Sequence, residues 1–157
     1  MIVYQATKSK FLEQVHSTDI EELVREAFIR KLGHRVGASE VRSWKASLDS
    51  MAKVLNDDAI PSDSGVAIEY NIPQTGKRVD FILTGRGENQ VPKVIVVELK
   101  QWEQSQRTEK DGIVSTFLGG SQREVSHPSY QAWSYAALLE DFNEAVHTGG
   151  VELRPCA

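Results

Sequence analysis

The sequence of 157 residues is poor in cysteine, with Cys156 as its single example. One cysteine excludes an intrachain disulfide and a cysteine-based zinc site. No apolar run approaches the roughly 18 residues that a membrane-spanning helix needs. The first residues also lack a basic leader followed by an apolar stretch and a cleavage site. From these absences we expect a cytoplasmic protein with no membrane partner.

An excess of positive charge is also missing. The chain has 18 Lys and Arg against 22 Asp and Glu, which gives a formal net charge of −4. This balance argues against a protein that coats nucleic acid through bulk charge alone. It does not exclude an enzyme that acts on nucleic acid, because carboxylates that hold metal ions make the net charge more negative. With 40% hydrophobic and 25% charged residues, we expect residues 1–157 to form a single folded domain.

Helical patterns follow a short expected edge strand in the segment IVYQAT. Thr18 and Glu21 have the spacing of a capping box, which predicts a helix that begins there and ends at Gly33. A second helix is predicted over residues 39–55, where apolar residues recur at alternating steps of three and four. These residues are Val41, Trp44, Leu48, Met51 and Leu55.

Strand-like patterns begin after a polar loop at residues 56–65. Residues 66–72 and 78–83 flank turn residues at 73–77, so they predict a β-hairpin. After another polar loop at 85–92, the β-branched run 94–100 (VIVVELK) predicts an interior strand that is buried on both faces.

The last third of the chain alternates short elements. Residues 101–110 predict a loop or a short helix, and residues 112–118 with 123–126 predict a small hairpin around two glycines. His127-Pro128 predicts the start of a helix that ends near Phe142. His127 is expected to be its N-cap, with a substrate contact as the alternative, and VELRPCA predicts a final strand. Four residues of this helix are expected on its apolar side: Tyr130, Trp133, Ala137 and Leu138. The whole pattern predicts an α/β fold, a mixed central sheet flanked by helices.

Strand alternation brings three charged residues together. The apolar residues of each strand share one face: Val79, Phe81 and Leu83 in one strand, and Ile95, Val97 and Leu99 in the other. Asp80 therefore points to the opposite face of its strand, as Glu98 and Lys100 do on theirs. If the two strands are neighbours, these side chains converge, and burying them is costly unless they are paired or bind a metal.

Such a set suits phosphodiester hydrolysis. Two carboxylates, Asp80 and Glu98, can hold Mg²⁺ or Mn²⁺, and the backbone carbonyl of Leu99 offers a further oxygen ligand. Lys100 would orient the attacking water or stabilise developing charge. An additional acid stays open among four glutamates, with Glu69 and Glu22 retained as candidates beside Glu21 and Glu26. Lys77 and Arg78 are candidate phosphate contacts.

Asp80 followed by Glu98-Leu99-Lys100 resembles the motif of the PD-(D/E)xK nuclease superfamily, with Val79 in place of the usual proline. Gln131-Ala-Trp-Ser-Tyr135 is similar to the Q-x-x-x-Y motif of its RecB-like branch, and this spacing places both polar residues on one helix face. The resemblance implies a restriction-endonuclease-like fold and a Mg²⁺- or Mn²⁺-dependent deoxyribonuclease. It implies that Gln131 and Tyr135 belong to the active site.

Most of the chain also resembles the N-terminal nuclease lobe of bacterial proteins that continue into a Schlafen group 3-like DNA/RNA helicase. The matching segments are MIVYQATKS, VAIEYNIPQTGKRVDFILTG, VVELKQW and HPSYQAWSYAALLEDFN. This resemblance implies a longer polypeptide, a C-terminal helicase domain as partner and a DNA substrate, single-stranded DNA above all, with RNA as the alternative. Two other hypotheses stay open: a catalytically inactive nucleic-acid-binding or helicase-docking module, and a different metal-dependent phosphoesterase.

Overall fold

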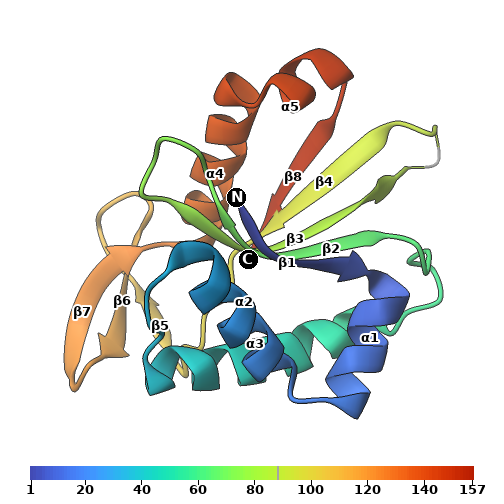
Figure 1. Ribbon diagram of the computed structural model, residues 1–157. Helices are drawn as coiled ribbons and strands as arrows, with labels where there is room; N and C mark the ends of the chain where they lie inside the picture. The colour runs from blue at the N-terminus through green and yellow to red at the C-terminus, as the bar shows by residue number, and fades with distance from the viewer. Residues whose placement is uncertain (88) are drawn as a thin grey trace.

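The computed structural model describes residues 1–87 and 89–157 and contains two β-sheets with helices around the larger one (Figure 1). The larger sheet comprises β1 (Ile2–Thr7), β2 (Gly65–Asn71), β3 (Arg78–Arg86), β4 (Pro92–Val97) and β8 (Glu152–Cys156). The smaller sheet comprises β5 (Ser105–Arg107), β6 (Ile113–Leu118) and β7 (Ser121–Ser126). The helices are α1 (Lys8–Ser17), α2 (Ile20–Leu32), α3 (Ala38–Leu55), α4 (Pro128–Phe142) and α5 (Glu144–Gly149).

The larger sheet is mixed, with strand order β1-β2-β3-β4-β8. Neighbouring strands from β1 to β4 are antiparallel, and β8 lies parallel to β4. Helices α1 to α3 lie on one side of this sheet and α4 with α5 on the other (Figure 1). The predicted α/β class with a mixed sheet between helices is therefore confirmed, and β1 is an edge strand as expected.

Two hydrophobic cores hold these layers together. The first lies between the sheet and α1–α3 and includes Phe11, Val24, Trp44, Leu48, Val66, Ile68, Phe81 and Val97. The second lies between the sheet and α4 and includes Ala67, Ile72, Val79, Ile82, Val96, Tyr135, Ala136 and Leu139. Because both faces of the sheet are covered, its inner strands are apolar on both sides.

The N-terminal helices differ from the prediction. Helix α1 was not expected; it begins directly after β1, and the Thr7 side chain caps it by accepting a hydrogen bond from Lys10 N. Thr18 closes α1, and its hydroxyl donates to Gln14 O over 2.7 Å. The predicted capping box at Thr18 is therefore wrong, since Asp19 is the N-cap residue of α2. Gly33 ends α2 as predicted, in the left-handed conformation with φ 74°.

Helix α3 and the hairpin agree closely with the sequence patterns. The predicted stripe of α3 is buried at four of its five positions, and Val41 packs against the same core half-buried. Strand β3 continues to Arg86, beyond the predicted end, whereas β4 ends at Val97, before Glu98 and Lys100. Glu88 of the predicted 85–92 loop lies outside the described residues.

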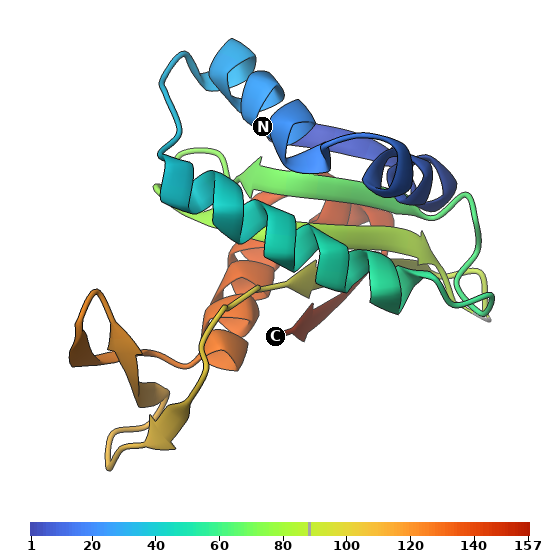
Figure 2. The same cartoon turned by 90° about the horizontal axis from the view of Figure 1, so that it is seen from below.

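The small sheet was only partly expected. The hairpin of β6 and β7 is confirmed, but residues 105–107 form strand β5 beside it and not a loop or short helix. Figure 2 shows this sheet projecting from the body of the protein, between the segment that follows β4 and the start of α4. It therefore connects the two parts of the chain that carry Lys100 and Gln131.

Helix α4 begins and ends as predicted, and the His127 ring accepts a hydrogen bond from Ser129 N over 3.1 Å. Its expected apolar side is wrong for Tyr130 and Trp133, whereas Leu138 packs against the second core. Tyr130 and Trp133 are 54% and 56% exposed. The buried residues are Ala132, Tyr135, Ala136 and Leu139, which form one stripe at helical spacing. Helix α5 was not expected, and the final strand is confirmed as β8.

Candidate active site

The predicted site lies where β3 and β4 separate. Phe81 pairs with Val97, and one step further the same register places Asp80 opposite Glu98. No ladder pair is formed there among the described residues. Instead, Asp80 Oδ2 accepts a hydrogen bond from the backbone amide of Leu99 over 2.9 Å. Glu98 keeps a backbone hydrogen bond to β8, the other strand beside β4, because its amide donates to Cys156 O over 3.0 Å.

Glu98 and Lys100 form an ion pair beside Asp80. Glu98 is 2% exposed, and its Oε1 atom accepts a hydrogen bond from Lys100 Nζ. The second carboxylate oxygen, Oε2, is buried and has no hydrogen-bond partner in the described part of the chain. Asp80, Glu98 and Lys100 are thus brought together as predicted. A buried carboxylate oxygen without a donor is costly, and it leaves Glu98 able to accept a further cation or donor.

Strict alternation does not continue through Asp80. Phe81 packs in the first core, but Val79 packs in the second with Ile82. The expectation that Val79 and Phe81 share a face is therefore wrong. The neighbouring strand changes faces at the same row, since Ile68 lies in the first core and Tyr70 packs against the second. The face of the sheet that the side chains of β2 and β3 occupy therefore switches at the row of Asp80. Sequence periodicity alone does not show this switch.

Burial dominates the electrostatics of the two acids. It raises the pKa of Asp80. It also raises the pKa of Glu98 to about 7, and the negative charge of Asp80 adds to this shift while Lys100 opposes it. Two carboxylates that approach each other in a buried place disfavour the doubly ionised state. A bound cation would relieve that repulsion.

Of the candidate additional acids, Glu69 reaches the site and Glu22 does not. Glu69 lies opposite Asp80 in the register of β2 and β3, between the pairs Ile68–Phe81 and Tyr70–Val79. Glu22 forms a surface ion pair with Arg25 one helical turn away, and it lies outside the cavity beside Asp80.

The α4 pair predicted from the Q-x-x-x-Y spacing is formed. Gln131 Nε2 donates to the Tyr135 hydroxyl over 2.7 Å. Tyr135 is buried, and burial raises its pKa, with smaller contributions from the negative charges of Glu98 and Asp80.

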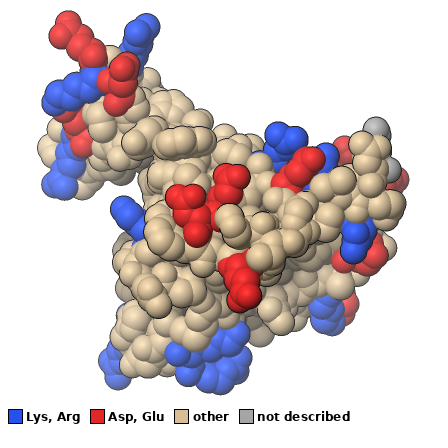
Figure 3. All heavy atoms as spheres, turned by 90° about the horizontal axis from the view of Figure 1, so that it is seen from above, with Lys and Arg blue, Asp and Glu red and all other residues tan. Residues whose placement is uncertain are grey.

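The candidate phosphate contacts have separate environments. Lys77 is exposed in the hairpin turn and lines an open cleft with Gln131 and Tyr135. Arg78 is held inward by two glutamates, Glu40 and Glu69. Figure 3 shows acidic and basic side chains in small separate groups, with uncharged surface between them. Broad electrostatic attraction on the face shown would therefore be weak, in keeping with the net charge of −4.

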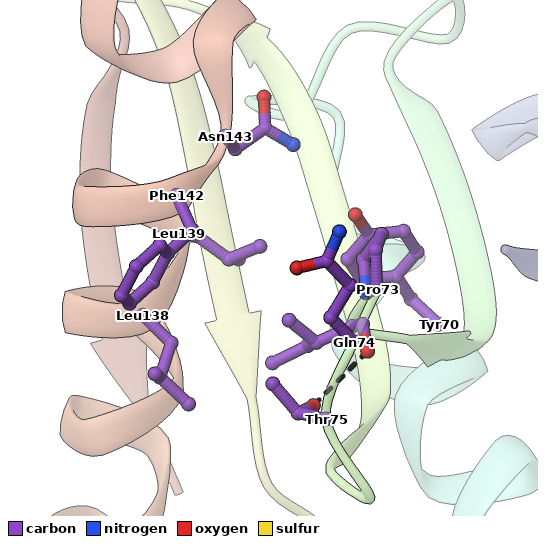
Figure 4. A pocket seen from close by; sticks show the side chains of 9 residues that line it. Tyr70, Pro73, Gln74, Thr75, Leu138, Leu139, Phe142 and Asn143 are labelled. Carbon is purple, nitrogen blue, oxygen red and sulfur yellow. Dashed lines mark hydrogen bonds between the residues drawn. The ribbon is translucent and has the colours of Figure 1, made fainter.

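Two cavities flank the sheet on opposite sides. One, of about 150 Å³, lies between α3 and the sheet and is lined by Asp80, Lys100, Arg78 and Trp44, among others. The other, of about 250 Å³, lies between the hairpin turn and α4, where Tyr70, Pro73, Leu139 and Phe142 contribute to its wall (Figure 4). None of the predicted site residues lines this second, mostly apolar cavity.

A divalent metal fits the donors present. Within residues 1–87 and 89–157, no three His, Cys, Asp or Glu side chains form a ready-made metal cluster. The opposed carboxylates of Asp80 and Glu98, with the unpartnered Glu98 Oε2, supply the hard oxygen donors that Mg²⁺ or Mn²⁺ prefers. Leu99 contributes its amide to Asp80, and the role of its carbonyl stays a prediction.

Two contributors to the site were not identified from the sequence. Trp44 was assigned to the core, yet its Nε1 donates to Glu69 Oε1 over 2.7 Å. Gln101 Nε2 donates to Ser43 O over 2.6 Å and so fastens the segment after Lys100 to α3. The signal for Trp44 was available, because a buried indole N–H requires an acceptor. Gln101 showed no comparable signal.

No helix within the described residues is long and apolar enough to cross a membrane. Comparisons with models of protein families, with curated proteins and with solved structures find no match to this chain.

Proposed function

We propose that this chain is a divalent-metal-dependent nuclease domain of the PD-(D/E)xK type, in its RecB-like branch. The observation that carries the proposal is the placement of Asp80 opposite Glu98 where β3 and β4 separate, with Lys100 bonded to Glu98. The sheet order and the helices on both of its faces are compatible with a restriction-endonuclease-like fold.

Each residue has a separate task in the proposed reaction. Asp80 and Glu98 would hold Mg²⁺ or Mn²⁺, and the bound metal would neutralise phosphate charge and lower the pKa of water. Lys100, 28% exposed at its side chain, orients the attacking water and stabilises the charge that develops at phosphorus. Gln131 and Tyr135 position the phosphate from α4. The water oxygen bonds to phosphorus and the water gives up one proton, while one P–O ester bond breaks and the leaving oxygen takes up one proton. The products are a phosphomonoester and a free hydroxyl.

The proposed substrate is DNA, with RNA as the alternative, and the proposed partner is a C-terminal helicase domain in the same polypeptide. These two proposals rest on the sequence resemblance and on the phosphodiester chemistry proposed for the site. A cytoplasmic location stays a prediction from the sequence. The exposed Lys77 beside Gln131 and Tyr135 is compatible with a nucleic-acid strand that approaches along α4.

A cleavage assay tests the proposal. The protein is incubated with single-stranded DNA, double-stranded DNA and RNA in Mg²⁺, Mn²⁺ or EDTA. Asp80→Asn and Lys100→Ala are compared with Asp63→Asn, which changes an exposed loop acid and serves as the matched control. We expect metal-dependent cleavage by the wild type and the control but not by the two site variants.

The assay also distinguishes the nuclease proposal from the competing hypothesis of an inactive binding module. An inactive binding module would bind nucleic acid equally with and without metal and would cleave none of the substrates. That result, with no metal binding by calorimetry, would contradict the nuclease proposal.

A further inference from the structure

Glu69 lies directly opposite Asp80 but faces away from the position that strand alternation assigns to it. Its backbone is left-handed, with φ 58°, a conformation that is uncommon for residues other than glycine. The side chain is 2% exposed and reaches Trp44 of α3, on the side of the first core. An acid that is buried in a disfavoured backbone conformation requires contacts that hold it there.

Those contacts join three elements. Glu69 Oε1 accepts the hydrogen bond from Trp44 Nε1, and Glu69 Oε2 lies 2.5 Å from Arg78 Nε. The second contact is an ion pair without a well-aligned hydrogen bond. Arg78 Nη2 also donates to Glu40 Oε1 over 2.7 Å, and the guanidinium lies 5.6 Å from the centre of the Phe28 ring. Glu69 thereby ties β2 to α3 and to the first residue of β3.

We infer that Glu69 is a positioning residue for Asp80, an inference that rests on the proposed nuclease function. Arg78 precedes Asp80 by two residues on β3, at the end of the strand that β4 no longer pairs with. The β2–β3 ladder pairs Arg78 with Asn71 and Val79 with Tyr70 but, in the part of the chain that the structure describes, forms no pair at Asp80. The Glu69–Arg78 contact adds a side-chain support to this segment on the edge where the β3–β4 ladder gives none. Because Trp44 and Arg78 lie against its two oxygens, Glu69 has in this inference a positioning role and not that of a metal ligand.

Glu69→Gln tests this role. Glutamine keeps an acceptor for Trp44 but turns an amide N–H₂ toward Arg78, so the Glu69–Arg78 ion pair is lost while the packing and the Glu40–Arg78 hydrogen bond are kept. Loss of an outer contact of this kind typically lowers activity about 10- to 100-fold. We expect such a fall in kcat, with KM changed by less than about threefold and the unfolding temperature close to that of the wild type. Glu22→Gln, which breaks a surface pair, is the control.

The outcomes distinguish failure of the positioning role of Glu69 from failure of the proposed nuclease function. A folded Glu69→Gln protein with the kcat of the wild type overturns the positioning role, and so does a variant that loses stability alone. If Glu69→Gln does not fold, Arg78→Gln takes its place, since this side chain is 33% exposed; wild-type kcat in that variant overturns the inference. Absence of metal-dependent cleavage by the wild type overturns the proposed function and this inference with it.

Discussion

The backbone amide of Leu99 donates a hydrogen bond to the Asp80 carboxylate over 2.9 Å. Leu99 lies past the end of β4, and Asp80 lies one step beyond the last pair of the β3–β4 ladder. A side chain thus replaces the main-chain acceptor that would have continued the sheet. This contact keeps the two strands together while Asp80 and Glu98 stand opposite each other without a ladder bond between them.

Replacing Lys100 by Ala is expected to lower metal-dependent cleavage by about 100- to 1,000-fold, the effect of removing one preorganised electrostatic contact. It also leaves the buried Glu98 carboxylate without its donor, which costs about 1–3 kcal/mol of stability. Cleavage rates and urea unfolding measure the two effects. Lys10→Ala is the matched control, because Lys10 and its partner Glu13 are both exposed and the variant should change neither. Equal behaviour of the two variants would contradict the role of Lys100.

The metal-free protein is expected to be more stable at about pH 5.5 than at about pH 8. Burial raises the pKa of both Glu69 and Glu98 to about 7, from an ordinary value of 4.5. The folded state therefore binds protons that the unfolded chain has released. This stabilisation is complete below the unfolded pKa and is lost as the pH rises through the folded pKa.

Thermal unfolding in EDTA across this range measures the effect. The Glu69→Gln and Glu98→Gln double variant should show a flatter pH dependence, and the comparison removes the contribution of the 4 histidines, which both proteins share. An identical pH dependence in the two proteins would show that these glutamates are not shifted.

Tyr135→Phe is expected to lower cleavage about 10-fold or more while the unfolding temperature changes little. The buried ring keeps its packing in the second core, and only the hydroxyl that accepts from Gln131 is lost. Contacts of this outer kind typically contribute 10- to 100-fold (an order-of-magnitude range). Tyr130→Phe on the same helix is the control, because that tyrosine is exposed. An active Tyr135→Phe protein would remove the hydroxyl from the proposed site.

Phe11→Ala is expected to destabilise the protein by about 3–5 kcal/mol. Phe11 is completely buried in α1, and its ring meets that of Phe81 edge-on at 5.8 Å. Phe117→Ala removes the same side chain from an exposed position on β6, so its free energy of unfolding should change by no more than about 0.5 kcal/mol. Similar losses for both would mean that α1 does not pack as described.

The strands that lead to the candidate site were easier to predict than the helices. A β-branched run with Glu98 and Lys100 at its end has few alternatives to an interior strand, and the turn at 73–77 fixes the neighbouring strand that carries Asp80. Helix α1 was missed because its sequence, KSKFLEQVHS, is largely polar and buries only Lys8 and Phe11. Its stability comes from tertiary packing, and a short helix shows little of that in its own sequence.

Strand alternation and the expected apolar side of α4 gave wrong predictions at particular residues. Alternation assigns Val79 to the face of Phe81, but the left-handed backbone at Glu69 accompanies a change of face in both strands. Trp133 is exposed, although its large hydrophobic side chain predicted a place on the apolar side of α4. The sequence does not give the position of the sheet, which decides the side of α4 that is buried. Such departures collect at functional or strained positions, and here one of them lies beside Asp80.

Whether Asp80 and Glu98 together bind a divalent cation is tested most directly by calorimetric titration of Mn²⁺ into the wild type and Asp80→Asn. Asparagine keeps an acceptor for Leu99 N, so the variant should fold while losing one of the two charges. We expect Mn²⁺ to bind the wild type with release of protons near neutral pH, since the pKa of Glu98 is raised to about 7. The variant should bind at least about 10-fold more weakly. Equal binding, or no binding by the wild type, would contradict the account.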